Sequence, residues 1–314
     1  MSHLLEVEKL QVDIPIPAGD LHAVRGISFA VAKGETLGLV GESGCGKSTL
    51  GRLALALLPP TRGRIVFAGE DLARVSRKHL KELRRQIQII FQDPYSSLNP
   101  RMTAGQILEE PFVIHNLGRR PERRAWVEEL LTEVGLTADV ADRYPHEFSG
   151  GQRQRLGIAR ALALKPRLIV ADEPVSALDV SIQAQILNLL AELQQRHRLT
   201  YLFISHDLGV ISQISNRVAV MYVGRLLEMA SREILAAARL HPYTEALLAA
   251  VPRPTPERTF NPPALKGEPP SPVNVPSGCP FHPRCPEAQF PLCRETVPPL
   301  RETAPDHRVA CHFR

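Results

Sequence analysis

Short apolar runs of strand length recur along the chain and alternate with stretches of helical periodicity. The apolar runs cover residues 35–40, 87–91, 168–171, 201–205 and 217–222. Helical patterns cover residues 48–58, run from about 180 to 197, and return briefly after residue 206. Strands that alternate with helices are typical of an α/β fold whose sheet is mainly parallel. The pattern therefore predicts one large α/β domain over residues 1–250.

Two regions depart from this alternation. Residues 103–143 are helical in pattern and rich in Glu, Arg and Leu, which predicts a helical subdomain, at about residues 95–160, inserted in the domain. Residues 251–278 hold nine prolines among 28 residues, too many for the interior of a helix or sheet. We expect this segment to be an extended strap that opens a separate C-terminal region, residues 251–314.

Composition and charge narrow the class of protein. The chain has 314 residues, of which 44% are apolar and 23% charged, as in ordinary globular proteins. The net charge of +5 comes from scattered Lys and Arg rather than a basic run, so no nucleic-acid partner is indicated. The N-terminus lacks the pattern of a signal peptide, and no run approaches the roughly 18 apolar residues of a membrane helix. We expect a cytosolic protein that reaches a membrane only by docking on other subunits.

A glycine-rich loop follows the first predicted strand and opens a helix. It fits the pattern G-x-x-x-x-G-K-S/T and consists of Gly41, Glu42, Ser43, Gly44, Cys45, Gly46, Lys47, Ser48 and Thr49. Such a loop wraps backbone N–H groups around a β-phosphate, while its lysine reaches the β- and γ-oxygens and its Ser hydroxyl ligates Mg²⁺. Cys45 occupies a variable position and is interpreted as a small spacer. The loop predicts nucleotide binding.

Polar residues follow three of the predicted strands, at the sheet edge where ligands of α/β proteins bind. Asp172 can hold Mg²⁺, and Glu173, one residue further, can polarise an attacking water. Gln92 can contact Mg²⁺ or that water, and His206 can donate a hydrogen bond to the γ-phosphate. Beside the glycine loop, these residues predict nucleotide hydrolysis.

A second phosphate-binding pattern lies in the middle of the chain, at Phe148-Ser149-Gly150-Gly151-Gln152-Arg153-Gln154-Arg155. A serine hydroxyl, two glycines and a helix N-terminus together suit a phosphate. Since the chain already has one phosphate loop, this segment predicts that each nucleotide is held from two sides.

Four of the five cysteines gather near the C-terminus: Cys279, Cys285, Cys293 and Cys311, separated by five, seven and seventeen residues. In a reducing compartment such a group indicates a metal site before disulfides. The spacing contains no C-x₂-C pair, and four thiolates suit zinc or an iron–sulfur cluster equally well.

These motifs occur in the order found in the ABC transporter ATPases, and the chain resembles that family over about residues 4–250. The resemblance implies an ABC-type P-loop NTPase with a RecA-like, mainly parallel sheet core, which binds ATP and Mg²⁺. It assigns ATP binding to residues 41–49, Gln92, Ser149, Gly150, Gly151, Gln152 and Asp172, and Mg²⁺ binding to Ser48, Gln92 and Asp172. It assigns catalysis to Glu173 as the base, with His206, Gln92 and Lys47. It also implies that residues 149–152 complete the site of a second chain.

Further motifs resemble the oligopeptide/dipeptide importer branch: residues 91–102, 144–148, 179–181, 241–244 and 278–285. This branch works with a second ATPase, two membrane permeases and an extracytoplasmic binding protein, which places the chain at the cytoplasmic face of the membrane. The branch also favours a [4Fe–4S] cluster over Zn²⁺ on the four tail cysteines. Import of nickel or another small solute, and a soluble ABC ATPase outside transport, are the alternatives. Unlike most of the family, residues 12–17 offer no aromatic side chain to stack on adenine, and the sequence leaves substrate and dimer partner open.

Overall fold

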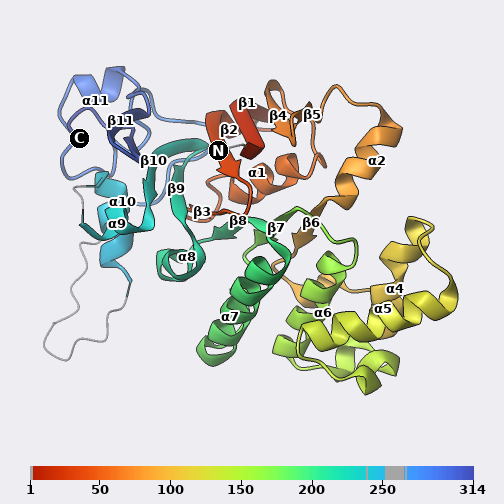
Figure 1. The fold of residues 1–314 in the computed structure, drawn as a ribbon. Coiled ribbons are helices and arrows are strands. Elements are labelled where there is room, and N and C mark those ends of the chain that lie inside the picture. Colours follow the sequence, from red (N-terminus) through yellow and green to blue (C-terminus); the bar gives the residue numbers. More distant parts are fainter. Residues whose placement is uncertain (1–2, 238–239, 252–264, 266) are drawn as a thin grey trace, which may run out of the picture. The chain divides into compact units, whose positions relative to one another are not determined.

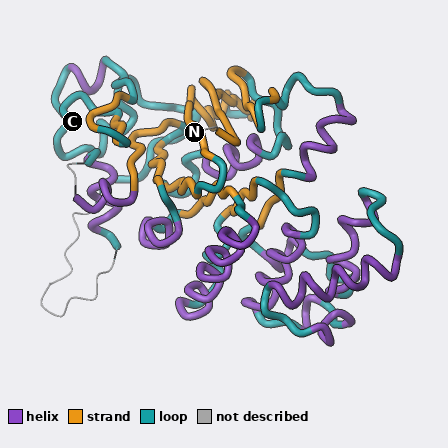
Figure 2. Tube along the Cα trace, viewed as in Figure 1, coloured by secondary structure: helices purple, strands orange, loops and turns teal. Residues whose placement is uncertain are grey.

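The computed structural model describes residues 3–237, 240–251, 265 and 267–314. The chain forms two compact units (Figure 1). Unit 1 consists of Met1–Arg74 and Phe203–Arg314, and unit 2 of Val75–Leu202. Figure 2 shows that strands concentrate in unit 1 and helices in unit 2, so the two units are described in turn.

Unit 1 contains an antiparallel sheet of four strands in the order β2-β1-β4-β5. These strands are β1 (His3–Ile16), β2 (Gly19–Ala32), β4 (Arg62–Phe67) and β5 (Glu70–Asp71). Alternating side chains of β1 are buried, among them Leu5 and Val7, as expected for a sheet with one covered face.

A second group of strands in unit 1 carries the phosphate loop. Strand β3 (Thr36–Val40) is wholly buried and pairs in parallel with β9 (Arg217–Tyr222). Antiparallel pairing then adds β10 (Arg225–Ser231), β12 (His307–Val309) and β11 (Arg301–Ala304). The C-terminal region therefore extends the sheet that begins at the loop.

The helices of unit 1 are short. They are α1 (Lys47–Ala54), α8 (Leu208–Ile214), α9 (Arg232–Ala237), α10 (Pro242–Ala249) and α11 (Leu292–Glu295). Each of α1, α8 and α10 buries residues against the unit, including Leu50, Ile211 and Tyr243, none of which is exposed.

Unit 2 joins a small parallel sheet to a group of helices. Strand β6 (Ile87–Ile90) pairs in parallel with β7 (Leu168–Asp172), and β8 (Thr200–Ser205) begins in unit 2 and ends in unit 1. The helices are α2 (Arg77–Arg85), α3 (Pro94–Ser97), α4 (Ala104–Ile114), α5 (Arg120–Glu133), α6 (Gly150–Leu162) and α7 (Val180–His197), with single 3₁₀ turns at Ala138–Asp142 and Pro145–Glu147. Helices α4, α5 and α6 pack on one another (Figure 1).

The observed elements agree closely with the pattern of apolar runs, with three differences. Helix α1 ends at Ala54 rather than at residue 58, because Ala56 takes a left-handed conformation with φ of 52°. The helical stretch at 103–143 contains two helices and a 3₁₀ turn. The antiparallel sheet of β1 and β2 was not predicted. Half of the proline-rich strap predicted at 251–278, namely residues 252–264 and 266, lies outside the described residues.

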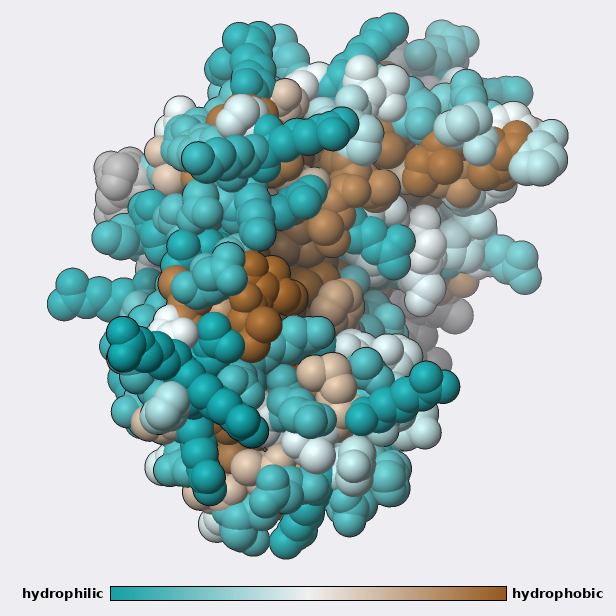
Figure 3. All heavy atoms as spheres, turned by 90° about the vertical axis from the view of Figure 1, so that its right-hand side faces the viewer, coloured by the Kyte–Doolittle hydropathy of each residue, from teal (hydrophilic) through white to brown (hydrophobic). Residues whose placement is uncertain are grey.

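None of the helices in the described part of the chain combines the length and apolar character that a bilayer crossing needs. In Figure 3, hydrophilic residues cover most of the face shown, and hydrophobic residues gather toward its middle.

Candidate functional site

The phosphate loop runs from the end of β3 into α1, and two of its glycines are required by close contacts. A Cβ atom on Gly41 would lie 2.1 Å from the carbonyl oxygen of Met221. A Cβ atom on Gly46 would lie 2.1 Å from the carbonyl oxygen of Ala23, and Gly46 has a φ of 104°, which side-chain-bearing residues rarely adopt. The loop is therefore pressed against two strands of unit 1, β9 at Gly41 and β2 at Gly46.

Lys47 is almost completely buried, with 5% of its surface exposed. Its Nζ donates to the carbonyl oxygens of Gly41, at 2.7 Å, and Glu42, at 3.0 Å. Neighbouring Cys45 is also buried, and burial raises the pKa of its thiol. The ammonium group is held by loop carbonyls that a phosphate can replace, while Cys45 stays a neutral spacer, as its position in the motif indicated.

Two residues far away in sequence, Tyr243 and Arg284, hold Glu42, and sequence reasoning missed their role. Its backbone N–H donates to the hydroxyl of Tyr243 at 3.0 Å. Its carboxylate accepts two hydrogen bonds from Arg284, at 2.6 and 3.0 Å, and Arg284 also donates to the Tyr222 hydroxyl at 3.3 Å. The sequence does mark these residues, because Tyr243 and Arg284 belong to two of the motifs on which the resemblance to the importers rests.

His206 also lies in unit 1, exposed directly after β8. The residues on either side fix the backbone there: the N–H of Asp207 donates to the Ser205 hydroxyl at 3.0 Å, and the Asp207 carboxylate accepts from the N–H of Gly209 at 2.7 Å as the cap of α8. The predicted strand-end position of His206 is thus observed.

Unit 2 brings Gln92 and Glu173 together. The Gln92 side-chain amide donates to the Glu173 carboxylate at 3.0 Å. Asp172 ends β7, and Glu173 follows it with a φ of 48°, a strained backbone for a glutamate of the kind found at functional sites. The carbonyl oxygen of Glu173 accepts from the Ser176 hydroxyl at 3.1 Å, which helps to hold the turn.

The start of α6 is built as a capping box. The Ser149 hydroxyl accepts from the N–H of Gln152 at 3.3 Å, and the Gln152 side chain accepts from the N–H of Ser149 at 2.9 Å. Ser149 and Gly150 are exposed. A Cβ atom on Gly151 would lie 2.7 Å from the Ile182 side chain, so only glycine fits there without movement. The segment thus presents an exposed helix N-terminus.

The four tail cysteines line one small cavity of about 20 Å³ in unit 1. His282, Glu287 and His312 also line it. Burial raises the pKa of the Cys279 thiol to about 11, and the other three cysteines add to the rise. Among the described residues, no group of three or more His, Cys, Asp and Glu side chains is arranged so that it could hold a metal ion. We call residues 267–314 the cysteine tail.

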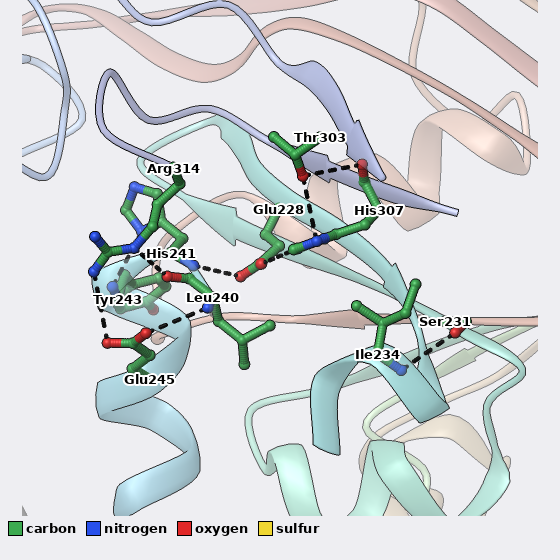
Figure 4. A network of polar contacts seen from close by, with 10 residues as sticks. All are labelled: Glu228, Ser231, Ile234, Leu240, His241, Tyr243, Glu245, Thr303, His307 and Arg314. Carbon is green, nitrogen blue, oxygen red and sulfur yellow. Dashed lines mark hydrogen bonds and ion pairs between the residues drawn. The ribbon is translucent and has the colours of Figure 1, made fainter. Parts of the chain in front are cut away.

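Buried polar groups hold the cysteine tail against the remainder of unit 1 (Figure 4). Glu228 of β10 is completely buried and accepts from His307 of the tail at 2.7 Å and from the N–H of His241 at 3.1 Å. Burial raises the pKa of Glu228, and the hydrogen bond from His307 opposes that rise. The guanidinium of Arg314 lies beside Glu287, at 2.6 Å, and Glu245, at 3.8 Å.

The chain is similar to known proteins over nearly its whole length. Residues 24–176 match the family "ABC transporter", and residues 227–293 match "Oligopeptide/dipeptide transporter, C-terminal region". The oligopeptide transport ATP-binding protein AppF of Bacillus subtilis is 54% identical, with 99% of this chain and 97% of AppF covered. A probable peptide ABC transporter ATP-binding protein of Sinorhizobium fredii is 55% identical, with coverage of 99% and 90%.

Solved structures agree on the fold. The chain matches cbiO1 of Clostridium perfringens, part of an ABC transporter complex, with a TM-score of 0.67 and 30% identity over 76% of this chain and 92% of cbiO1. A dimeric ATP-binding cassette bound to ADP and Pi matches with a TM-score of 0.67 and 28% identity, over 73% of this chain and 98% of that one. The fold is the mixed α/β cassette with a mainly parallel core, and the chain belongs to the ABC transporter ATP-binding proteins of the oligopeptide/dipeptide family.

Proposed function

We propose that this chain binds and hydrolyses ATP to drive the import of short peptides. The observation that carries the proposal is a complete phosphate loop with a buried lysine, in a chain 54% identical throughout to an oligopeptide transport ATP-binding protein. Reconstitution with its permeases and binding protein tests the substrate: ATP hydrolysis should rise with short peptides. Stimulation by nickel or another small solute instead would favour the alternative importer.

Residues 41–49 hold the ATP phosphates in this proposal. Lys47 leaves the carbonyl oxygens of Gly41 and Glu42 and moves to the β- and γ-phosphates, while the loop N–H groups surround the β-phosphate. Mg²⁺, when bound, neutralises charge on the phosphates, and by the family pattern Ser48, Gln92 and Asp172 are its ligands. His206 donates to the γ-phosphate.

Glu173 is the proposed general base, and its hydrogen bond to Gln92 links it to the residue that reports the state of the γ-phosphate. The variant Glu173→Gln should bind ATP, accumulate as a closed dimer and lose turnover. The matched control is Glu192→Gln, an exposed acid on α7, which should leave hydrolysis unchanged. Wild-type turnover by Glu173→Gln would refute the assignment.

Ser149, Gly150, Gly151 and Gln152 complete the site of a second ATPase subunit. Ser149 and Gly150 are exposed and offer the phosphate a hydroxyl and a helix N-terminus. Closure of two chains head to tail then gates hydrolysis. The second subunit is a paralogue or another copy of this chain, and size-exclusion chromatography with ATP distinguishes them.

The remaining partners are two permeases and an extracytoplasmic binding protein, with the chain at the cytoplasmic face of the membrane and no nucleic acid bound. Phe91 and Tyr95, next to Gln92, are large apolar residues exposed by 40% and 56%, which suits a protein contact. Through them, the proposed helical subdomain at 95–160 of the 1–250 ATPase domain would pass closure to the permeases.

The four tail cysteines are proposed to hold a [4Fe–4S] cluster, with Zn²⁺ as the alternative. All four line one cavity, and Cys279, Cys285, Cys293 and Cys311 are free thiols that can ligate once deprotonated. Anaerobically purified protein should be brown and absorb near ~400 nm. Colourless protein with one zinc per chain would decide for the alternative.

A further inference from the structure

We propose that Arg284 is a positioning residue for the phosphate loop, and that through it the cysteine tail sets how tightly the loop holds ATP. The inference rests on the ATP binding proposed above and not on any metal in the tail. The cysteine tail thereby gains a role in ATP binding that neither the glycine-rich loop motif nor the cysteine pattern predicts.

The contact between Arg284 and Glu42 has the geometry of a strong ion pair. Two guanidinium nitrogens meet the carboxylate at 2.6 and 3.0 Å, a bidentate arrangement that fixes orientation as well as distance. The Arg284 side chain is only 6% exposed and that of Glu42 25% exposed. Removing either partner leaves the other charge partly buried without its counter-charge, so the remaining side chain loses the position that the pair gives it.

Every hydrogen-bonding group of Glu42 is engaged in holding the loop. Its carboxylate is bound by Arg284 and its N–H by the Tyr243 hydroxyl. Its carbonyl oxygen accepts from Lys47. Of these, the bond from Lys47 is the one that ATP binding replaces, so Arg284 and Tyr243 keep the loop in shape while the lysine moves to the phosphates. Preorganised donors bind a ligand without the cost of ordering them.

Arg284 is itself fixed by the packing of the tail. Phe281 is completely buried, lies edge-on to Tyr222 at 5.4 Å between ring centres, and packs on Tyr243 at 5.3 Å. The N–H of Arg284 donates to the carbonyl oxygen of Phe281 at 3.0 Å. Cys279 and Cys285 flank this segment on either side and face the tail cavity. The packing around the cysteines therefore fixes the position of Arg284, which holds the loop.

The experiment compares two buried tail arginines in the full-length chain. Arg284→Ala removes the contact with the loop. Arg314→Ala is the matched control, because the Arg314 side chain is 3% exposed and pairs with Glu287 and Glu245 but not with the loop. ATP binding by wild type, measured first, tests the proposed function by itself. We expect Arg284→Ala to raise the Kd and the KM for ATP about tenfold with kcat changed less, within the usual range of coupling between sites.

Two further variants separate positioning from general destabilisation. Arg284→Lys keeps the charge but loses the bidentate geometry, so its ATP affinity should fall between wild type and Arg284→Ala. The double variant Glu42→Ala/Arg284→Ala should bind ATP no more weakly than Arg284→Ala, since both changes break one interaction. Equal losses of ATP affinity in Arg284→Ala and Arg314→Ala, or additive losses in the double variant, would overturn the proposal.

Coupling is reciprocal, so ATP must also tighten the tail. Hydrogen exchange of peptides covering residues 278–286 should slow when ATP is added to wild type and to Arg314→Ala. In Arg284→Ala, ATP at saturating concentration should leave this exchange unchanged. Tail exchange that ignores ATP in wild type, while ATP binds, would also overturn the proposal.

Discussion

The phosphate loop and the start of α6 present the same chemistry, backbone N–H groups and a hydroxyl at a helix N-terminus, in opposite settings. The loop is pressed against β9 at Gly41 and against β2 at Gly46, and its lysine is 5% exposed. At the start of α6, Ser149 and Gly150 are exposed, and Ser149 forms a local capping box with Gln152. The loop is held by distant parts of its unit, whereas the start of α6 is capped by its own residues and packs on α7 at Ile182.

The two regions therefore obtain their stabilising contacts in different ways. Every support of the loop comes from the same chain, including the ion pair from Arg284. The start of α6 is capped locally by Ser149 and Gln152, and Ser149 and Gly150 are exposed. An exposed, self-capped helix N-terminus suits a phosphate brought by another subunit, which is the arrangement proposed above.

The largest expected effect separates the role of the phosphate loop from that of the start of α6. Lys47→Ala should abolish ATP binding, because the loop loses its only ammonium group. Ser149→Arg places a bulky cation at an exposed position and should leave ATP binding near wild type, while hydrolysis falls by about 100-fold or more. Nucleotide fluorescence and phosphate release measure the two properties separately. Loss of ATP binding by folded Ser149→Arg would contradict the account.

Substitutions at Gly46 and Gly44 test how tightly the phosphate loop packs. Both have positive φ, but a Cβ atom on Gly46 meets the Ala23 carbonyl, whereas nothing lies within 4 Å of one on Gly44. Gly44→Ala should lower the free energy of unfolding by about 1–2 kcal/mol, the cost of a left-handed alanine. Gly46→Ala should cost more, about 3 kcal/mol, because overpacking adds to the strain. Equal losses in chemical denaturation would count against the tight contact.

The site could be predicted from sequence wherever a motif is continuous. Residues 41–49, 149–152 and 172–173 were found because the chemistry of each lies within a few neighbouring residues. Gln92 and His206 followed from their positions at strand ends. Their roles remain proposals that the variants above test.

What sequence could not supply is contact across long separations. Glu42 and Arg284 are 242 positions apart, and nothing in either local pattern indicates their pairing. Strands β1 and β2 were missed because their apolar positions are interrupted by bulges, such as those between Val7 and Leu10. The short tail strands depend on pairing rather than on their own pattern, since β12 pairs with β10 and β11 pairs with β12.

A smaller effect tests whether the capping box at α6 has a second role. Ser149→Ala and Thr103→Ala each remove the cap of a capping box in unit 2, at α6 and α4. Each should lower the free energy of unfolding by about 1 kcal/mol. Hydrolysis should fall only in Ser149→Ala, since Thr103 has no part in the nucleotide site. Equal hydrolysis in the two variants would show that Ser149 only caps its helix.

His241, a buried residue at the start of α10, should affect how the free energy of unfolding depends on pH. Burial lowers the pKa of His241 to about 3, so the folded chain keeps this ring neutral where the unfolded chain takes up a proton. Stability should therefore decrease as pH falls from about 6.5 toward 3, by up to about 1.4 kcal/mol per pH unit. His241→Asn can still cap α10 and should lose this part of the dependence. An unchanged pH profile in that variant would contradict the assignment.

The most direct test of the central claim, that the α6 start serves a site on another chain, is complementation. Lys47→Ala keeps an intact α6 start and Ser149→Arg keeps an intact loop, so each variant alone should be inactive. If the chain pairs with its own copies, an equal mixture should hydrolyse ATP at about one quarter of the wild-type rate, because half of randomly formed dimers contain one intact site of two. A mixture no more active than the sum of the separate variants, when size-exclusion chromatography shows that the chain pairs with itself, would contradict the account.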